Sequence, residues 1–501
     1  MDTLASYDEL PYDSLPLPET QPDVIAAVAR LHGFDAQDPT RARILELGCA
    51  QGGNLIPLAW RWPACECIGI ELSRVQAAAG ADFVAHLGLQ NVRILHGDLA
   101  ALPGDLGEFD YIIAHGVYSW VPPAVQQALL DACRRHLSPQ GLAYVSFNVA
   151  AGWAPLAPLR AALRERTDAA LPAPARCRQA LRVLDELAGE WSDAALRKEI
   201  AYLRSAPPSY LFHEYLAEFN EAIDFASFAA RLDSHDLRYV GEVGPRRAVV
   251  ELEDAWGLAP EGMTGRWHDA EGALDAVLGT RFRRVLVARA DAECAQPPQV
   301  ERLASLAFYA DLASDEEIDL DAANEQVFVN PAGNRFAVAE PAMKAAVMAL
   351  SMVYPRALTY AALLDAAHGV MADFGAAGEI DAMVLQDALF RLVMVHGVMP
   401  TVWTGATGGE PGERPVAHAL ARLQAVRPDW VVSGTRHVAL DLDAAGRELL
   451  ARLDGTLTQD ALSAHMHANL RGSGLELART QVDALTARQL WQFARQGLLI
   501  A

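Results

Sequence analysis

The sequence predicts an α/β protein that begins with a doubly wound, largely parallel sheet and ends in helix-rich domains. Three observations carry this prediction. Strand-like apolar runs alternate with helical segments through the first 150 residues. A glycine-rich turn joins the first strand-like run to the first helix, as in doubly wound folds. After Cys294 the pattern changes to one hairpin-like stretch followed by groups of helices.

Five strands are predicted in the first part of the chain. Their sequences are RILELG (43–48), CIGIELS (67–73), NVRILHGD (91–98), FDYIIAHG (109–116) and LAYVSFN (142–148). Helices are expected at 55–62, with Pro57 in the first turn, at 74–87 and at 125–136. Because strands and helices alternate, the sheet should be parallel and should bind its ligand at the C-terminal ends of the strands.

Two further strands are expected well after Asn148. Residues 153–206 are rich in Ala, Leu and Arg at helical spacing and predict a helical insertion. FASFAARLDSHDLRYVGEV (225–243) predicts a helix and then a strand, and RFRRVLVAR (281–289) predicts another strand. We expect these to be strands six and seven of the same sheet, the last one antiparallel. The insertion would cover a substrate or form a dimer contact.

The C-terminal part predicts two tandem units that resemble winged helices. EQVFVNPAGNRFAV indicates a hairpin, followed by helices near 340–353, 359–367 and 381–395 and by the strand-like MPTVW. A similar order recurs from AGRELLARLDG to the terminal LLIA, after a Gly/Pro-rich stretch at 404–415. The predicted parts of the chain are a sheet core (1–150), an insertion and regulatory region that completes the sheet (151–295), and two winged-helix-like units (296–404 and 405–501).

The charge of the chain argues against nucleic-acid binding. The 501 residues carry a formal net charge of −23, and nucleic-acid affinity depends on Lys and Arg. Residues 296–501 hold 15 basic and 24 acidic residues, so the winged-helix-like units favour protein recognition or packing over DNA. We therefore expect no nucleic-acid partner.

Cysteine usage and hydropathy indicate a cytoplasmic protein. The six cysteines are scattered without a C-x-x-C pair, so neither a disulfide framework nor a zinc site is expected, and no metal is predicted. The N-terminal sequence MDTLASYDEL does not look like a signal peptide. The most apolar run, around 342–354, is too short for a membrane span and contains Lys344.

The glycine loop indicates which ligand the sheet binds. The second glycine of a dinucleotide fingerprint would fall at Ala50, and no Gly-Lys-Ser/Thr is present. Glu46, inside the first strand, would repel a pyrophosphate but attract a cationic amino-acid group. Glu71, at the end of the second strand, suits the two hydroxyls of a ribose. E-L-G-C-A-x-G-G, Glu71 and the Gly-Asp pair at 97–98 together resemble the S-adenosylmethionine site of class I methyltransferases. Another Rossmann-like enzyme with a degraded loop is the alternative.

Longer stretches extend this resemblance to one group. SYDELPYDS, ELGCAQGGNLIP, GIELS and FDYIIAHGVYSWVPP resemble bacterial protein-lysine methyltransferases that modify outer-membrane proteins, and the wider set of methyltransferases with a methyltransferase regulatory domain. YLFHEYLAEFN (210–220) is similar to the regulatory region of that group. The resemblance weakens after about residue 260.

The resemblance implies S-adenosylmethionine as cofactor. Its methionine end would lie against Glu46 and the loop, its ribose at Glu71 and Leu72, and its adenine at Asp98 and Leu99. The other residues expected to contact it are Gly48, Cys49, Ala50, Gly52, Gly53, Asn54 and His115. Asn54 could instead cap the following helix.

The run HGVYSWVPP (115–123) is the predicted acceptor region, because in class I enzymes the end of the fourth strand adjoins the methyl group. The Asn/Asp-Pro-Pro-aromatic tetrapeptide of many amine-directed members is missing. Tyr118 and Trp120 would form an aromatic wall for an amine or would be core residues. His115 would be a general base or would line the cofactor pocket through its backbone. Asn148 would orient the acceptor or satisfy a loop.

The acceptor is expected from the resemblance to be a lysine side chain of a protein. A small-molecule or natural-product methyltransferase and a non-catalytic scaffold that binds S-adenosylmethionine are the alternatives. The roles of His213 and Glu214, outside the five-strand core, stay open. A homodimer is possible.

Overall fold

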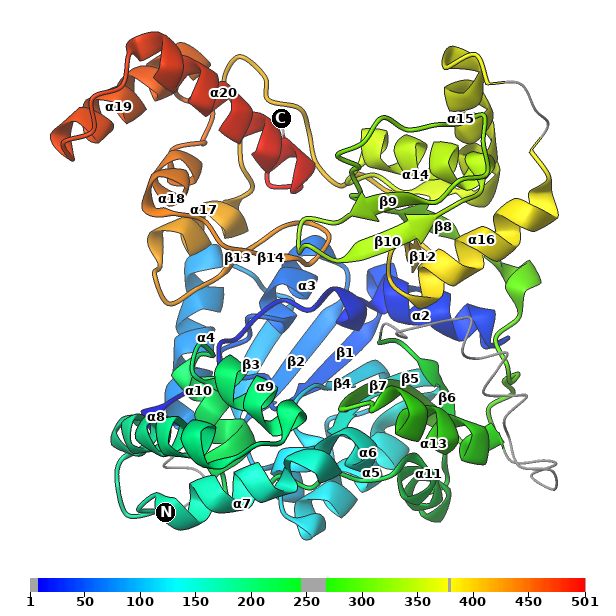
Figure 1. Ribbon diagram of the computed structural model, residues 1–501, viewed down its shortest axis with the longest axis vertical. Coiled ribbons are helices and arrows are strands. Elements are labelled where there is room, and N and C mark those ends of the chain that lie inside the picture. The colour runs from blue at the N-terminus through cyan, green and yellow to red at the C-terminus, as the bar shows by residue number, and fades with distance from the viewer. Residues whose placement is uncertain (1–7, 245–266, 377–379, 501) are drawn as a thin grey trace.

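The computed structural model describes residues 8–244, 267–376 and 380–500. Within these ranges, seven strands form one sheet in the order β3-β2-β1-β4-β5-β7-β6 (Figure 1). The strands are β1 (Arg43–Leu47), β2 (Glu66–Glu71), β3 (Val92–His96), β4 (Phe109–Ala114), β5 (Leu137–Asn148), β6 (Leu237–Glu242) and β7 (Phe282–Arg289). Strand β7 pairs antiparallel with both of its neighbours, and the other pairings are parallel. The predicted class I fold is confirmed, including two late strands after a helical insertion.

Helices cover both faces of the sheet. One face buries the apolar sides of α2 (Pro22–Leu31), α3 (Leu55–Arg61) and α4 (Arg74–Leu87). The opposite face buries those of α5 (Pro123–His136) and α11 (Phe225–Ser234). Strands covered on both faces need apolar side chains at successive positions, which explains the continuous apolar runs of the sequence.

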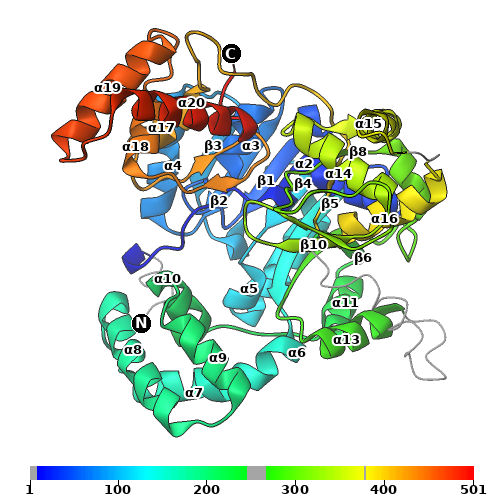
Figure 2. The same ribbon diagram turned by 45° about the horizontal axis from the view of Figure 1, so that its top comes forward.

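The insertion between β5 and α11 forms a separate helical layer. Its helices share one apolar cluster and stand beside the sheet, at the lower left of Figure 2. They are α6 (Ala150–Trp153), η5 (Ala154–Leu156), α7 (Ala157–Arg166), α8 (Ala173–Glu190), α9 (Ala194–Leu203), α10 (Pro208–Tyr210) and the π-helical η6 (Leu211–Leu216). Helix α13 (Trp267–Leu278) precedes β7.

Two further units, each with its own apolar cluster, follow β7 (Figure 1). The first contains η7 (Val300–Ser305), β8 (Ala307–Tyr309), β9 (Gln326–Val329), β10 (Arg335–Val338), α14 (Pro341–Val353), β11 (Leu358–Thr359), α15 (Tyr360–Asp373), α16 (Ala382–Met394) and β12 (Met399–Thr401). The second contains α17 (Ala419–Val426), β13 (Val432–Ser433), β14 (Ala439–Leu440), α18 (Ala444–Ala451), α19 (Gln459–Gly472) and α20 (Arg479–Arg495). The predicted boundaries between these parts stay predictions. Among the described helices, none combines the length and apolar character that crossing a membrane requires.

Candidate active site

The glycine loop after β1 has the backbone that its sequence predicts. Gly48 and Gly52 adopt φ angles of +72° and +86°, which side chains with a Cβ rarely adopt. Ala50 also has a positive φ, +50°, although it carries a Cβ. Its N–H donates to the Glu71 carboxylate over 2.8 Å, and this bond holds the loop against the end of β2. A ligand that engages Glu71 therefore also acts on the loop.

A strap formed by residues 8–21 crosses this loop. Ser14 accepts a hydrogen bond from the Gly53 N–H over 2.8 Å. A Cβ on Gly53 would lie 2.1 Å from the Ser14 carbonyl oxygen, so only glycine fits under the strap. We did not assign the strap to the site from the sequence. The signal was the stretch SYDELPYDS, which we used only for family resemblance.

Glu46 carries a buried carboxyl group, and only one of its two oxygens is hydrogen-bonded within the described chain. Its side chain is 4% exposed, and Oε1 accepts from Asn54 Nδ2 over 2.9 Å. Oε2 has no hydrogen-bond partner among the described residues. Burial, together with the nearby charge of Glu71, raises the pKa of Glu46 to about 8 despite the Asn54 bond. An unpaired buried carboxyl is costly, and a cationic group beside it would remove that cost. The ammonium of S-adenosylmethionine fits this description.

The remaining predicted cofactor residues lie at the neighbouring strand ends. Glu71 accepts the N–H groups of Ser73 and Ala50, and burial still raises its pKa. Leu72 beside it is 40% exposed. Asp98 is exposed and accepts the Ala100 N–H at the start of η3 (Leu99–Ala101). We call these C-terminal ends of β1, β2 and β3 the cofactor edge.

Asn54 does not cap α3 with its side chain, so that alternative is wrong. None of the described α3 amides bonds to it. Its Oδ1 instead accepts from three donors, the Leu17 N–H at 3.0 Å, Thr20 Oγ1 at 2.9 Å and His437 Nε2 at 2.7 Å. Its Nδ2 holds Glu46. The Asn54 amide bonds Glu46 rather than capping α3, because the buried Glu46 carboxyl would otherwise lose its hydrogen bond.

The HGVYSWVPP run forms the short 3₁₀ helix η4 (Tyr118–Trp120) rather than an extended segment. Tyr118 is 1% exposed and packs edge-on against Phe228, and its hydroxyl accepts from Arg231. It therefore lies in the core between sheet and α11. Trp120 is also buried, at 6% exposed, but its ring centroid lies 6.3 Å from that of Phe282, and its Nε1 finds no acceptor in the described chain.

His115 is half-buried at the end of β4. Its Nδ1 is hydrogen-bonded to the Tyr144 hydroxyl at 2.9 Å, and its ring meets Phe282 edge-on. Burial lowers its pKa to about 4, against the opposing charge of Glu19. An imidazole with that pKa is a weak base for an ammonium group. The position of His115 therefore suits lining the cofactor pocket better than acting as a general base.

A second buried carboxyl lies beside the end of β5. Glu214, on η6, is 7% exposed, and its Oε1 accepts from the Tyr12 hydroxyl over 2.9 Å. Its Oε2 is unpaired within the described residues. Burial raises the pKa of Glu214 to about 7, although Tyr12, Asn148 and Arg160 act in the opposite direction.

The strap and η6 meet through aromatic and polar contacts. The His213 ring stacks on Tyr12 at 4.5 Å, and His213 Nε2 is bonded to the Leu10 carbonyl over 2.7 Å. Asn148 donates from Nδ2 to Asn220 Oδ1 over 2.8 Å. Asn220 Nδ2 in turn donates to the Glu214 carbonyl over 2.9 Å, so the structure links Asn148 to Glu214, with His213 adjacent on η6. We call the ends of β4 and β5 with the start of β7 the acceptor edge.

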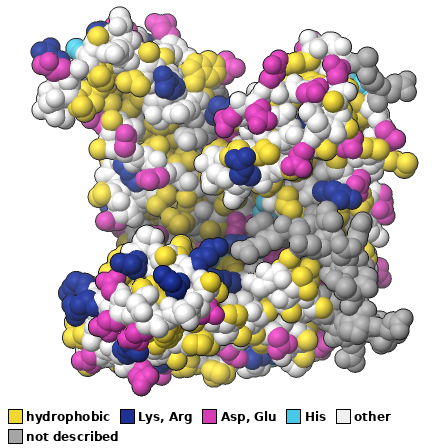
Figure 3. Space-filling model, in the orientation of Figure 1, with side chains coloured by type: hydrophobic (Ala, Val, Ile, Leu, Met, Phe, Trp, Pro, Cys, Tyr) yellow, Lys and Arg dark blue, Asp and Glu magenta, His cyan; other side chains and the backbone are white. Residues whose placement is uncertain are grey.

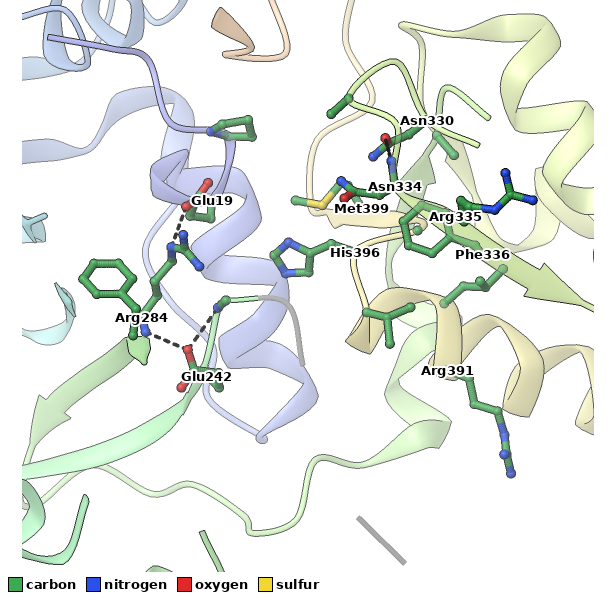
Figure 4. Close-up of a pocket in the computed structure, with 18 of the residues that line it drawn as sticks. Glu19, Glu242, Arg284, Asn330, Asn334, Arg335, Phe336, Arg391, His396 and Met399 are labelled. Atoms are coloured by element: carbon green, nitrogen blue, oxygen red, sulfur yellow. Dashed lines mark hydrogen bonds and ion pairs between the residues drawn. The ribbon is translucent and has the colours of Figure 1, made fainter. Parts of the chain in front are cut away.

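A hollow of about 1080 Å³ opens next to the acceptor edge. Figure 4 shows Glu19 and Arg284 paired on the sheet side, and Figure 3 shows the molecular surface recessed between its domains. Phe282 lines the hollow and pairs in register with Asn148. Since His115 and Trp120 also face Phe282, this residue joins the hollow to the acceptor edge. Sequence reasoning missed Phe282, which looked like an ordinary strand residue.

Three family models match the chain. They are a methyltransferase domain at 44–141, a predicted methyltransferase regulatory domain at 207–289 and the PKMT C-terminal winged helix domain at 413–498. The first two correspond to the sheet and to the region that completes it. The third corresponds to the second C-terminal unit.

Relatives cover different shares of the chain. The uncharacterized protein RP789 of Rickettsia prowazekii is 29% identical over 69% of this chain and 65% of its own length, so the match spans less than two thirds of that relative. RP028 of the same organism, also uncharacterized, is 31% identical over 44% of this chain and 92% of its own length. The structure of PKMT2 from Rickettsia typhi in complex with AdoHcy has the same fold, with 21% identity, a TM-score of 0.81 and coverage of 98% and 100%.

The fold and the cofactor edge define a class I methyltransferase that uses S-adenosylmethionine. The methyltransferase domain is followed by a match to the regulatory domain. The chain belongs to one family with RP028, and within it the methyltransferase domain and the regulatory domain both match this chain. The resemblance predicted from the sequence is supported by the match to the PKMT C-terminal winged helix domain, and the PKMT2 structure has the same fold.

Proposed function

We propose that this chain is a protein-lysine N-methyltransferase. The observation that carries the proposal is the buried Glu214 carboxyl at the acceptor edge, whose Oε2 has no partner at hydrogen-bond geometry in the described chain and whose pKa is influenced by the nearby Asn148 amide. S-adenosylmethionine supplies a methyl group on an activated sulfonium. The chain must then hold the acceptor amine deprotonated, shielded from water and in line with that methyl group. In this proposal Glu214 holds the amine and takes its proton.

The pKa of Glu214 suits this exchange. A lysine ammonium ordinarily titrates near 10.4, roughly six pKa units above an ordinary glutamate. The pKa of Glu214, raised to about 7, narrows that gap. At about 1.4 kcal/mol per pKa unit, this makes proton transfer easier by roughly 4 kcal/mol. Burial also lowers the pKa of the amine, which narrows the gap further.

The transfer step then needs little more than alignment. The amine nitrogen forms a bond to the methyl carbon while the carbon–sulfur bond breaks, and the electron pair remains on sulfur. The proton lost by the ammonium passes to Glu214. In this proposal Asn148 orients the amine, while Trp120 and His115 line its path and exclude water. Tyr118 supports the loop from the core.

The cofactor assignments form part of the same proposal. Glu46 would pair with the methionine ammonium, Glu71 and Leu72 would receive the ribose, and Asp98 and Leu99 would face the adenine. The backbone of the glycine loop would close around the methionine end. The loop residues in this assignment are Gly48, Cys49, Ala50, Gly52, Gly53 and Asn54.

A protein acceptor is supported by three further observations. The hollow next to the acceptor edge, about 1080 Å³, is larger than a single side chain needs. The winged helix domain at 413–498 matches a model named for PKMT, an abbreviation of protein lysine methyltransferase. The acidic charge of the chain suits a basic segment as acceptor.

The scattered cysteines suit a cytoplasmic location, and a homodimer stays a prediction.

The test is transfer of labelled methyl groups to lysates of host cells that lack this protein, followed by mass spectrometry. We expect label on lysine side chains of one or a few proteins. Label confined to small molecules would replace the protein acceptor by a small one. Absence of any label, with S-adenosylmethionine binding intact by calorimetry, would favour the non-catalytic scaffold.

A further inference from the structure

The winged helix domain is docked against the half of the sheet that binds the cofactor. Trp430 stacks on Phe83 of α4 with ring centroids 3.7 Å apart, and His418 stacks on Trp60 of α3 at 4.2 Å. Trp430 is 5% exposed and belongs to the apolar cluster of the sheet face. The domain therefore shares a core with α3 and α4.

Two contacts pass from this domain to the glycine loop itself. Gln51 donates to the Asp429 carbonyl over 3.0 Å. His437, in the turn between β13 and β14, reaches Asn54 Oδ1 at 2.7 Å. The same turn is fixed on other sides, because Gln21 donates to the Arg436 carbonyl and Arg436 Nε donates to the Pro355 carbonyl.

In the contact between His437 and Asn54, the histidine is the hydrogen-bond donor. An amide oxygen only accepts, so His437 Nε2 must carry the proton and donate. His437 is 2% exposed, and burial lowers its pKa to about 3, so the ring stays neutral at working pH. Its backbone has a φ of +59°, which a histidine adopts only where its surroundings hold it.

Three donors on one amide oxygen fix the plane of Asn54. With Oδ1 held by Leu17, Thr20 and His437, Nδ2 points at Glu46 Oε1. Glu46 Oε2 is thereby left without a hydrogen-bond partner in the described chain. Loss of the His437 donor would leave the amide to Leu17 and to Thr20, whose hydroxyl also bonds the Leu17 carbonyl, so the orientation of the carboxyl would be less firmly fixed.

We infer that His437 of the winged helix domain is a positioning residue for cofactor binding, acting through Asn54 on Glu46. The inference rests on the proposed role of Glu46. It gives the C-terminal domain a part in the reaction: its docked position determines how tightly S-adenosylmethionine binds. It requires neither nucleic acid nor a protein partner at this domain.

The test is calorimetry of S-adenosylmethionine binding to the full chain carrying His437→Asn. Asparagine tolerates the left-handed backbone but is too short to reach Asn54. We expect the dissociation constant to rise roughly tenfold, as for one lost buried hydrogen bond. The KM for S-adenosylmethionine should rise with it, while kcat at saturating cofactor should change less than about twofold.

His467→Asn is the matched control. His467 lies in the same domain, and its hydrogen bond, 3.0 Å to the Leu477 carbonyl, stays inside that domain. This variant should keep the wild-type dissociation constant. Equal loss of affinity in both variants, or none in His437→Asn, would overturn the inference.

A double-mutant cycle with Asn54→Ala tests the route. If His437 acts through Asn54, adding His437→Asn to Asn54→Ala should weaken binding no further. Additive losses would overturn the inference.

Glu46→Gln distinguishes failure of the proposed cofactor role of Glu46 from failure of the inference about His437. If Glu46→Gln leaves affinity unchanged, the proposed cofactor role of Glu46 fails; if it weakens binding while His437→Asn does not, only the inference fails.

Discussion

At the cofactor edge most of the polar groups come from residues close together in sequence, whereas at the acceptor edge they come from four distant segments. Glu46, Ala50 and Asn54 lie within one strand, loop and helix start. Glu214 is instead held by Tyr12, 202 residues away, and lies beside Asn148 and the start of β7. Both edges contain a buried carboxyl with one unpaired oxygen in the described chain. The difference indicates that the groups assigned to the cofactor come from one local stretch, which the strap and His437 hold in place, whereas the groups of the acceptor edge are themselves contributed by the insertion, the strap and the sheet.

The largest effect should come from Glu214→Gln. The amide cannot take a proton, and loss of a general base typically lowers the rate by 10²–10⁴-fold. In the wild type, kcat/KM should rise with pH through about 7, because burial raises the pKa of Glu214 to about 7 and only the carboxylate accepts the proton. That rise should be absent in the variant.

Glu218→Gln is the control for this measurement. Glu218 is exposed and lies four positions along the chain, so its variant should keep the wild-type rate and pH profile. A normal rate in Glu214→Gln would make Glu214 a structural residue. Glu46 and Glu214 would then no longer be comparable as two functional buried carboxyls.

Binding of S-adenosylmethionine should release close to one proton at pH 7. The pKa of Glu46, raised to about 8, keeps most of the carboxyl protonated before binding, and a neighbouring ammonium favours the ionised form. The number of protons released should fall toward zero as the pH rises above the pKa of Glu46. Calorimetry in two buffers of different ionisation enthalpy measures this number. Glu46→Gln should abolish most of the release; unchanged release would assign the proton to another group.

A smaller effect is expected for Gly53→Ala under the strap. The new Cβ would collide with the Ser14 carbonyl, so we expect a loss of about 1–3 kcal/mol in the free energy of unfolding. Gly369→Ala in α15 is the control, since nothing in the described chain lies within 4 Å of its Cβ position and alanine favours helix. Denaturant unfolding compares the two. Equal stability of both variants would show that the strap moves aside freely.

Much of the sheet could be predicted from the sequence. Helix α4 begins at Arg74 and ends at Leu87, as its Ser73 cap and Gly88 indicate. The glycine loop and Glu71 were found because strand, turn and acidic residue follow each other at short spacing. Periodicity and turn chemistry are local, so they survive in a single sequence.

The contacts that complete the site could not be predicted in this way. Tyr12 with Glu214 and His437 with Asn54 join positions 202 and 383 residues apart. No local pattern encodes such a contact. Tyr118 shows the converse, because two aromatics at strand spacing suggested a common wall, but the 3₁₀ turn sends Tyr118 into the core and Trp120 toward Phe282.

The His437 contact also has a consequence for how the protein is made. A growing chain that has emerged as far as β7 already contains every strand of the sheet, and domains generally fold in order during synthesis. It still lacks the donor that fixes Asn54. A partly synthesised chain should therefore bind its methyl donor weakly. Tight binding would arrive only once the last domain has docked, so the order of synthesis itself would keep the affinity for the methyl donor low until the chain is complete.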